Sequence, residues 1–209
     1  MRAGARRLVR ALRDPSSIPL WIAAVAALAV AVPFVAFGGL DPATRAPLPR
    51  GTGDAVRTSL YEVTVLHAEL TDKIEEQYLS ADDGEDLLVV TAVIENLSDV
   101  PVGIVQTVDR VRSRLAGSST PLIDLVGVEA TSGPSAWRDE SVAAVVLQPR
   151  VPAEVRIAWP VPEGSFPDGS VAIDVYDAVA QGGQVILSSS AITWQRTEPA
   201  ARVTVRVDP

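Results

Sequence analysis

Side chains able to perform nucleophilic or metal chemistry are scarce in this 209-residue chain. It contains no cysteine and a single histidine, His67. Disulfides, thiolate catalysis and cysteine-ligated zinc or iron–sulfur centres are therefore excluded, and one chain cannot supply two histidine ligands to a metal. His67 lies in an apolar, alternating stretch, and no G-x-S-x-G motif supplies a nucleophile. We therefore predict neither a catalytic residue nor a cofactor.

A group of four carboxylates around Gly84 is the one candidate for metal binding. These residues are Asp82, Asp83, Glu85 and Asp86. Oxygen ligands of this kind suit Ca²⁺, but the spacing does not match the D-x-[DN]-x-[DN]-G loop of an EF-hand. An acidic, solvated turn is the simpler interpretation, and Ca²⁺ is kept as an alternative.

Three arginines at alternate positions form a candidate binding row. Arg110, Arg112 and Arg114 are separated by Val111 and Ser113, so a strand here would place all three guanidinium groups on one face. Such a row suits phosphate or carboxylate groups of an anionic envelope polymer or a lipid headgroup. The alternative is pairing with carboxylates of neighbouring strands on an exposed face.

Trp137 is the second candidate binding residue. It lies beside an arginine in the stretch 132–138, which contains glycine and proline. Tryptophan and arginine together are typical of protein-interaction hot spots. Trp137 could equally fold back as a lid on the core, and the sequence does not separate these alternatives.

The C-terminal three quarters of the chain alternate apolar and polar residues with a period of two. Val155, Ile157 and Trp159 give the clearest example. Strands are predicted over 60–70, 87–94, 108–115, 142–147, 153–159, 171–176, 184–194 and 203–207. The stretch 87–94 is apolar on both faces, as a central strand would be. Seven to nine short strands predict an all-β fold, an antiparallel two-sheet sandwich.

The N-terminus has a different composition. Segment 1–17 contains five arginines and one aspartate, segment 18–40 carries no charge, and the remainder has a net charge of −12. At 1.5 Å per residue, a helix over the 23 uncharged positions spans about 34 Å, enough for a bilayer core of about 30 Å. Arginines before the span and none soon after it favour a cytoplasmic N-terminus and an exported body.

We therefore predict a single-pass signal anchor at 18–40, in contact with the lipid bilayer. Its length favours an uncleaved anchor over a signal peptide, although Ala36-Phe37-Gly38 resembles a cleavage site. Trp21 suits the headgroup level, Pro33 suits a kink, and small residues four apart permit close contact with another membrane helix. Those small residues are Ala23, Ala27 and Ala31.

The domain organisation follows from these segments. Residues 1–17 form a basic cytoplasmic tail, 18–40 the anchor, 41–57 a stalk in which prolines and glycines break helices and strands, and 58–209 the β-domain. The acidic, exported body argues against nucleic acid as a partner.

Two motifs within 58–180 resemble a known class of domain. A strand ends in Asn96-Leu97-Ser98-Asp99-Val100-Pro101, and Leu147-Gln148-Pro149 leads into a strand that ends Trp159-Pro160-Val161-Pro162. This pattern resembles immunoglobulin-like extracytoplasmic domains of unknown function on anchored and secreted proteins of Gram-positive, actinobacterial-type bacteria. The resemblance implies an immunoglobulin-like β-sandwich and no catalytic residues.

The function predicted from these features is binding or scaffolding at the bacterial plasma membrane. The chain would be an accessory subunit or sensor of an envelope complex, and its partner another membrane or envelope protein or an anionic envelope polymer. One alternative is a β-sandwich hydrolase that uses a carboxylate pair such as Glu154 and Asp174. The other is a structural spacer without a ligand.

Overall fold

The computed structural model describes residues 46–108, 110–138, 143–183 and 190–208, and five residues of the predicted anchor. The five are Ile22, Val25, Ala26, Leu28 and Ala29, which are helical and exposed. The chain divides into two units, 1–44 and 45–209. Among the residues described, no helix has the length and apolarity needed to span a bilayer. The basic tail and Trp21, Ala23, Ala27, Ala31 and Pro33 lie outside the described residues.

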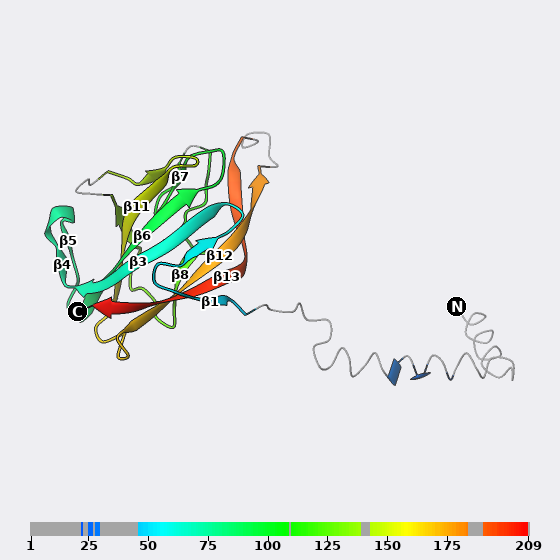
Figure 1. Ribbon diagram of the computed structural model, residues 1–209, viewed down its shortest axis with the longest axis horizontal. Helices are drawn as coiled ribbons and strands as arrows, with labels where there is room; N and C mark the ends of the chain where they lie inside the picture. Colours follow the sequence, from blue (N-terminus) through cyan, green and yellow to red (C-terminus); the bar gives the residue numbers. More distant parts are fainter. Residues whose placement is uncertain are drawn as a thin grey trace, which may run out of the picture. The chain divides into compact units, whose positions relative to one another are not determined.

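The described part of the second unit is built from strands and one short 3₁₀ helix, so the predicted all-β class is confirmed (Figure 1). The elements are β1 (Leu48–Gly51), β2 (Ala55–Arg57), β3 (Tyr61–Thr71), β4 (Lys73–Ile74), η2 (Glu75–Gln77), β5 (Leu79–Ser80), β6 (Glu85–Asn96), β7 (Val102–Gly103), β8 (Ile123–Val126), β9 (Ser135–Trp137), β10 (Val146–Leu147), β11 (Pro152–Pro162), β12 (Ser170–Gly182) and β13 (Ile192–Asp208). Several strands exceed ten residues, so the prediction of uniformly short strands is wrong.

The main sheet has nine strands and curls into two walls. Its order is β8-β12-β13-β3-β6-β11-β9, with β1 beside β13 and β2 beside β3. The prediction of two separate antiparallel sheets is wrong in two respects. The walls are joined where β13 meets β3, at Val207 and Ala68, and this junction is parallel, as is the pairing of β1 with β13. Most other ladders are antiparallel, as the alternation indicated.

Alternation along the long strands packs one face of each wall into the core. In β11, Val155 and Ile157 are at most 1% exposed, whereas Glu154 and Arg156 between and beside them face solvent. Complete burial of one such aliphatic side chain stabilises the fold by about 1.5–3 kcal/mol. β6 lies between β3 and β11 and buries both faces, which confirms the prediction of a central strand.

A β-bulge in β3 changes which residues face the core. Before the bulge, the odd positions Val63 and Val65 are buried; after it, the buried residue is Ala68. The register shifts between Val65 and His67, so two residues oppose one on β6. Leu66 is consequently 40% exposed, and His67 points outward rather than into a cleft.

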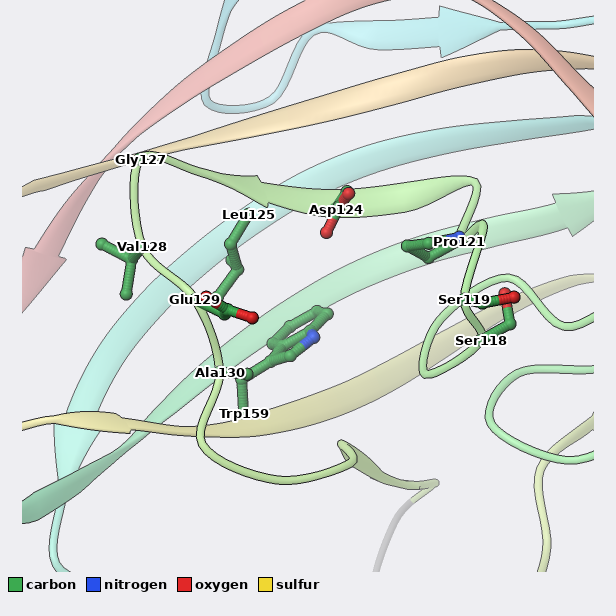
Figure 2. Close-up of a pocket in the computed structure, with 10 residues that line it drawn as sticks. All are labelled: Ser118, Ser119, Pro121, Asp124, Leu125, Gly127, Val128, Glu129, Ala130 and Trp159. Atoms are coloured by element: carbon green, nitrogen blue, oxygen red, sulfur yellow. The ribbon is translucent and has the colours of Figure 1, made fainter.

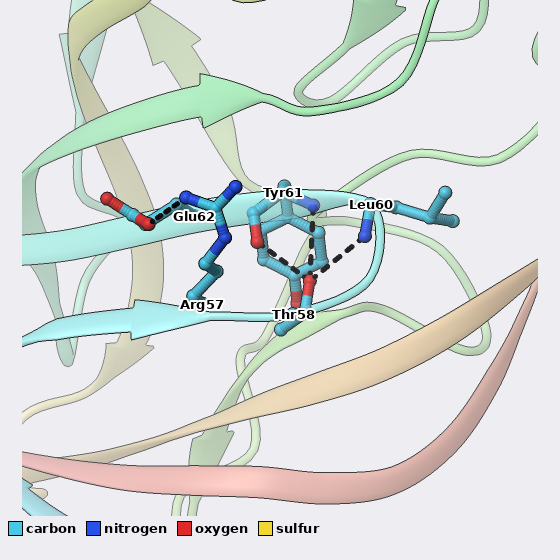
Figure 3. Close-up of polar contacts among 5 residues, drawn as sticks. All are labelled: Arg57, Thr58, Leu60, Tyr61 and Glu62. Carbon is cyan, nitrogen blue, oxygen red and sulfur yellow. Dashed lines mark hydrogen bonds and ion pairs between the residues drawn. The ribbon is translucent and has the colours of Figure 1, made fainter.

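The predicted stalk is wrong in its second half, because β1 and β2 lie within 41–57. Pro49 is tolerated in β1 because that strand pairs on one side only, with β13. Gly53, at φ +83°, makes the turn into β2. The following turn into β3 is closed by Thr58, whose hydroxyl oxygen accepts the Tyr61 N–H at 3.1 Å (Figure 3).

The strand predicted over 108–115 is also wrong. Val108 and Val111 bond each other's backbones, and Val111 forms an isolated bridge to Ile192 instead of a strand ladder. Within the predicted strand 142–147, β10 covers only Val146–Leu147, and within 184–194 the described strand begins at Ile192. Val142 and 184–189 lie outside the described residues.

A buried asparagine explains the motif Asn96–Pro101. The Asn96 side chain is fully buried, and its Nδ2 donates to the Val100 carbonyl at 2.7 Å and the Leu147 carbonyl at 3.2 Å. Its Oδ1 accepts from the N–H and the hydroxyl of Ser98. The Asn96 carbonyl also accepts the Arg150 N–H at 2.7 Å, so both sequence motifs meet at this one residue.

Candidate functional site

A depression lies where the two ends of the curled sheet approach each other. Its volume is about 520 Å³, and its lining includes Asp124 and Leu125 from β8 and Trp159 from β11. These strands stand near opposite ends of the strand order, so the depression marks the seam of the sheet. A smaller hollow of about 240 Å³ adjoins it and shares Asp124 and Trp159.

Two loops form the sides of this seam depression. Figure 2 shows the Trp159 indole between the segment that carries Glu129 and the loop that carries Ser118 and Ser119. Trp159 is only 4% exposed, so its ring forms the floor rather than a projecting platform. Figure 2 shows the indole nitrogen on the side of the ring nearer the loop of Ser118 and Ser119.

Backbone contacts hold both loops in place. The Thr131 N–H donates to the Pro160 carbonyl at 2.9 Å and so fixes the loop after β8 against β11, next to Trp159. The loop before β8 is fixed because the Arg196 guanidinium donates to the Pro121 carbonyl at 3.1 Å. Gly117, at φ +69°, has room only for a hydrogen, since a Cβ there would lie 2.9 Å from the ring of Pro134.

Asp124 is a charged residue of the depression whose pKa is shifted by its surroundings. Partial burial raises the pKa of the Asp124 carboxyl; Arg196 opposes this rise, and the Asp174 carboxylate adds to it. Arg196 lies 3.5 Å from Asp124 Oδ2 and 4.1 Å from the centre of the Tyr176 ring. The second carboxylate of the depression, Glu129, is exposed and forms no ion pair with a described residue.

The structure brings together two of the three predicted arginines. Arg110 and Arg112 flank the fully buried Val111 and are both exposed. The Arg110 carbonyl accepts the Ile192 N–H at 2.6 Å, and the Arg112 N–H donates to the Ile192 carbonyl at 3.0 Å, which fixes them along β13. Arg114 is half-buried and donates to the Val105 carbonyl at 3.1 Å. The predicted row of three on one face is therefore wrong, because the segment is not a strand.

Trp137 is a packing residue rather than an exposed contact. It is 3% exposed at the end of β9 and packs with Leu87, Val89 and Ala158 in a second apolar cluster on the outer face of the sheet. The hot-spot interpretation of Trp137 is wrong, because its indole is covered. The alternative of a lid on the core is not matched either, because this cluster lies on the face of β6 and β11 opposite the main core.

The acidic residues around Gly84 form a turn that leads into β6. The Glu85 N–H donates to the Asp82 carbonyl at 3.0 Å, and Gly84 has φ +82°. Within the described parts of the chain, no group of three or more histidine, aspartate or glutamate side chains is placed to hold a metal ion. This covers the Ca²⁺ candidate Asp82, Asp83, Glu85 and Asp86.

The carboxylate pair considered for hydrolysis is not assembled. Glu154 is exposed on β11, whereas Asp174 is 5% exposed on β12 and accepts two hydrogen bonds from Arg202, at 2.7 and 2.9 Å. The carboxylates that do share a concave surface are Asp124 and Glu129, which no sequence spacing singled out.

No protein-family model matches the chain, and no curated protein matches it. Among solved structures, an uncharacterized β-sandwich protein from Clostridium difficile 630 shares 13% identity, over 79% of this chain and 99% of that one, with a TM-score of 0.45. A putative lipoprotein from Bacillus subtilis shares 10%, over 68% and 38%, with a TM-score of 0.33. A conserved hypothetical protein from Bacillus anthracis shares 16%, over 60% and 89%, with a TM-score of 0.36.

Proposed function

We propose that the chain is a single-pass, membrane-anchored binding protein whose immunoglobulin-like β-domain stands outside the bacterial plasma membrane. The uncharged segment 18–40 after five arginines supports the anchor and its orientation. The domain would serve as an accessory subunit or sensor of an envelope complex. This assignment requires a surface on the domain that contacts a partner.

The observation that carries the binding function is the pair Arg110 and Arg112. Neither guanidinium forms an ion pair with a described residue, which also holds for the exposed Arg156 and Arg206. Arg110 and Arg112 differ from these two in standing only two residues apart in one segment. Their backbone is fixed by the two hydrogen bonds to Ile192, so little backbone freedom would be lost on binding. Two guanidinium groups on a fixed backbone segment, without an ion pair to a described residue, suit phosphate or carboxylate groups of an anionic polymer.

The acidic excess of the domain makes the arginine pair more important for binding an anion. The chain has a net charge of −8, which repels an anion at most of the surface. Binding would therefore depend strongly on the arginine pair and weaken as salt rises.

The test is binding of fluorescent polyphosphate of defined length to the full chain in detergent micelles. Replacing Arg110 and Arg112 by Gln should weaken binding about tenfold, or about 1.4 kcal/mol. The control replaces Arg156 and Arg206 by Gln, which alters net charge equally at two exposed positions elsewhere. Equal affinity of the two double variants for polyphosphate would contradict the proposal. Binding of the natural chain to phosphatidylglycerol vesicles but not to polyphosphate would reassign Arg110 and Arg112 to lipid headgroups.

A further inference from the structure

The seam depression has a chemistry that the arginine pair does not use. Its polar groups are the carboxylates of Asp124 and Glu129, the hydroxyls of Ser118 and Ser119, and the indole N–H of Trp159. Carboxylates accept hydrogen bonds, an indole N–H donates one, and a hydroxyl does both. A ligand that satisfies this set must offer donors and acceptors close together on a compact frame.

Size and charge narrow the class of ligand further. A volume of about 520 Å³, with the adjoining hollow of about 240 Å³, lies in the range of small-molecule sites. Two carboxylates disfavour an anionic ligand at short range. Pro121 and the small exposed part of Trp159 offer apolar contact to the non-polar face of a ring.

We propose that the seam depression binds a saccharide unit without an acid group. Its hydroxyls donate to Asp124 and Glu129 and accept from Ser118 and the Trp159 indole N–H. Each vicinal hydroxyl is both donor and acceptor, so one sugar ring can satisfy carboxylates as well as a serine hydroxyl and an indole N–H. The site is separate from Arg110 and Arg112 and needs no membrane anchor.

The loops around the depression are already fixed, so little conformational entropy would be lost on binding. Arg196 holds Asp124, Thr131 fixes one loop to β11, and Gly117 packs against Pro134 on the other side. Pre-organisation of this kind reduces the free-energy cost of association. Single sugar units nevertheless make few contacts, so we expect dissociation constants of about 1 mM.

The experiment is saturation-transfer NMR on the full-length chain in micelles of a detergent without a sugar headgroup. The probes are N-acetylglucosamine, which is neutral, and glucuronic acid, which carries a carboxylate. Saturation should reach the ring protons of N-acetylglucosamine and not those of glucuronic acid. Absence of transfer to N-acetylglucosamine, or equal transfer to both sugars, would overturn the proposal.

A matched pair of variants places the effect in the depression. Glu129→Ala removes an exposed acceptor from its side, and Glu163→Ala makes the same change in a distant exposed turn. Glu129→Ala should weaken N-acetylglucosamine binding about tenfold, the loss expected for one hydrogen bond to a charged group. Glu163→Ala should leave it unchanged. Equal affinities of the two variants would overturn the site, whatever the outcome for the arginine pair.

Discussion

Tyr61 provides a direct test of how the two walls are joined across the core. It begins β3 and is fully buried, and its hydroxyl lies 2.6 Å from the Tyr176 carbonyl of β12 and 2.9 Å from the Leu122 carbonyl before β8. The hydroxyl has one proton, so the two carbonyls share a single donor. Tyr61→Phe keeps the ring and removes only that donor.

The expected cost follows from burial. The Leu122 carbonyl still accepts the Tyr176 N–H at 2.8 Å, so the loss falls mainly on the Tyr176 carbonyl. A buried hydrogen bond lost in this way costs about 1–3 kcal/mol. For a domain of this size, about 2 kcal/mol lowers Tm by about 4–8 °C. Circular dichroism of the full chain during heating measures this change in Tm.

The control is Tyr78→Phe, the same change at a side chain that is 91% exposed, which should shift Tm by less than about 1 °C. Equal Tm values for the two variants would refute a bridging role for the Tyr61 hydroxyl.

The same residue predicts a dependence on pH. Burial raises the pKa of Tyr61 well above its ordinary value of 10.0, and the Asp177 carboxylate adds to the rise. Above about pH 10 the unfolded chain ionises this tyrosine while the folded chain does not, so its contribution to stability falls as pH rises. The Tyr61→Phe variant has no hydroxyl to ionise at this position, so it lacks this pH-dependent loss of stability. The stability gap between the natural chain and the variant should therefore narrow between about pH 9 and pH 11; a constant gap in urea titrations would contradict this assignment.

Other perturbations test further parts of the fold. Asn96→Ala removes a fully buried side chain and its four hydrogen bonds, and should cost about 2–4 kcal/mol in urea unfolding; a cost below about 1 kcal/mol would deny its organising role. Gly103→Ala places a Cβ 1.9 Å from the Gln106 carbonyl oxygen and should lower Tm markedly, whereas Gly133→Ala, with nothing within 4 Å, should not. The raised pKa of Asp124 means that its ionisation disfavours folding as pH rises above about 4. Asp124→Asn should accordingly be more stable, relative to the natural chain, at pH 7 than at pH 3, and the reverse order in urea titrations would contradict the sign.

Local periodicity predicts a strand within each of β3, β6, β11, β12 and the second half of β13, but not the full length of β12 or β13. In β11 and in the second half of β13, each residue's side follows from its position alone, because one face is packed and the other is solvated. The central place of β6 was also readable, since both of its faces are apolar.

The remaining features depend on contacts between distant segments. Nothing local distinguishes the parallel junction of Val207 with Ala68 from an antiparallel one. From the sequence alone, Pro49 predicts the end of a strand; it lies within β1 because that strand pairs with β13 on one side. The candidate site was missed for the same reason, because Asp124 and Trp159 meet only when the sheet curls and closes its seam.

The proposal that the β-domain stands outside the membrane is tested most directly by labelling single cysteines in intact bacterial cells. The natural chain has no cysteine, so it is a clean background. Asp83→Cys places a thiol in an exposed turn of the domain, and Ala3→Cys places one in the predicted cytoplasmic tail. A membrane-impermeant maleimide should label Asp83→Cys in whole cells and Ala3→Cys only after lysis. Labelling of Ala3→Cys in whole cells, with Asp83→Cys protected until lysis, would reverse the topology and contradict the proposed function.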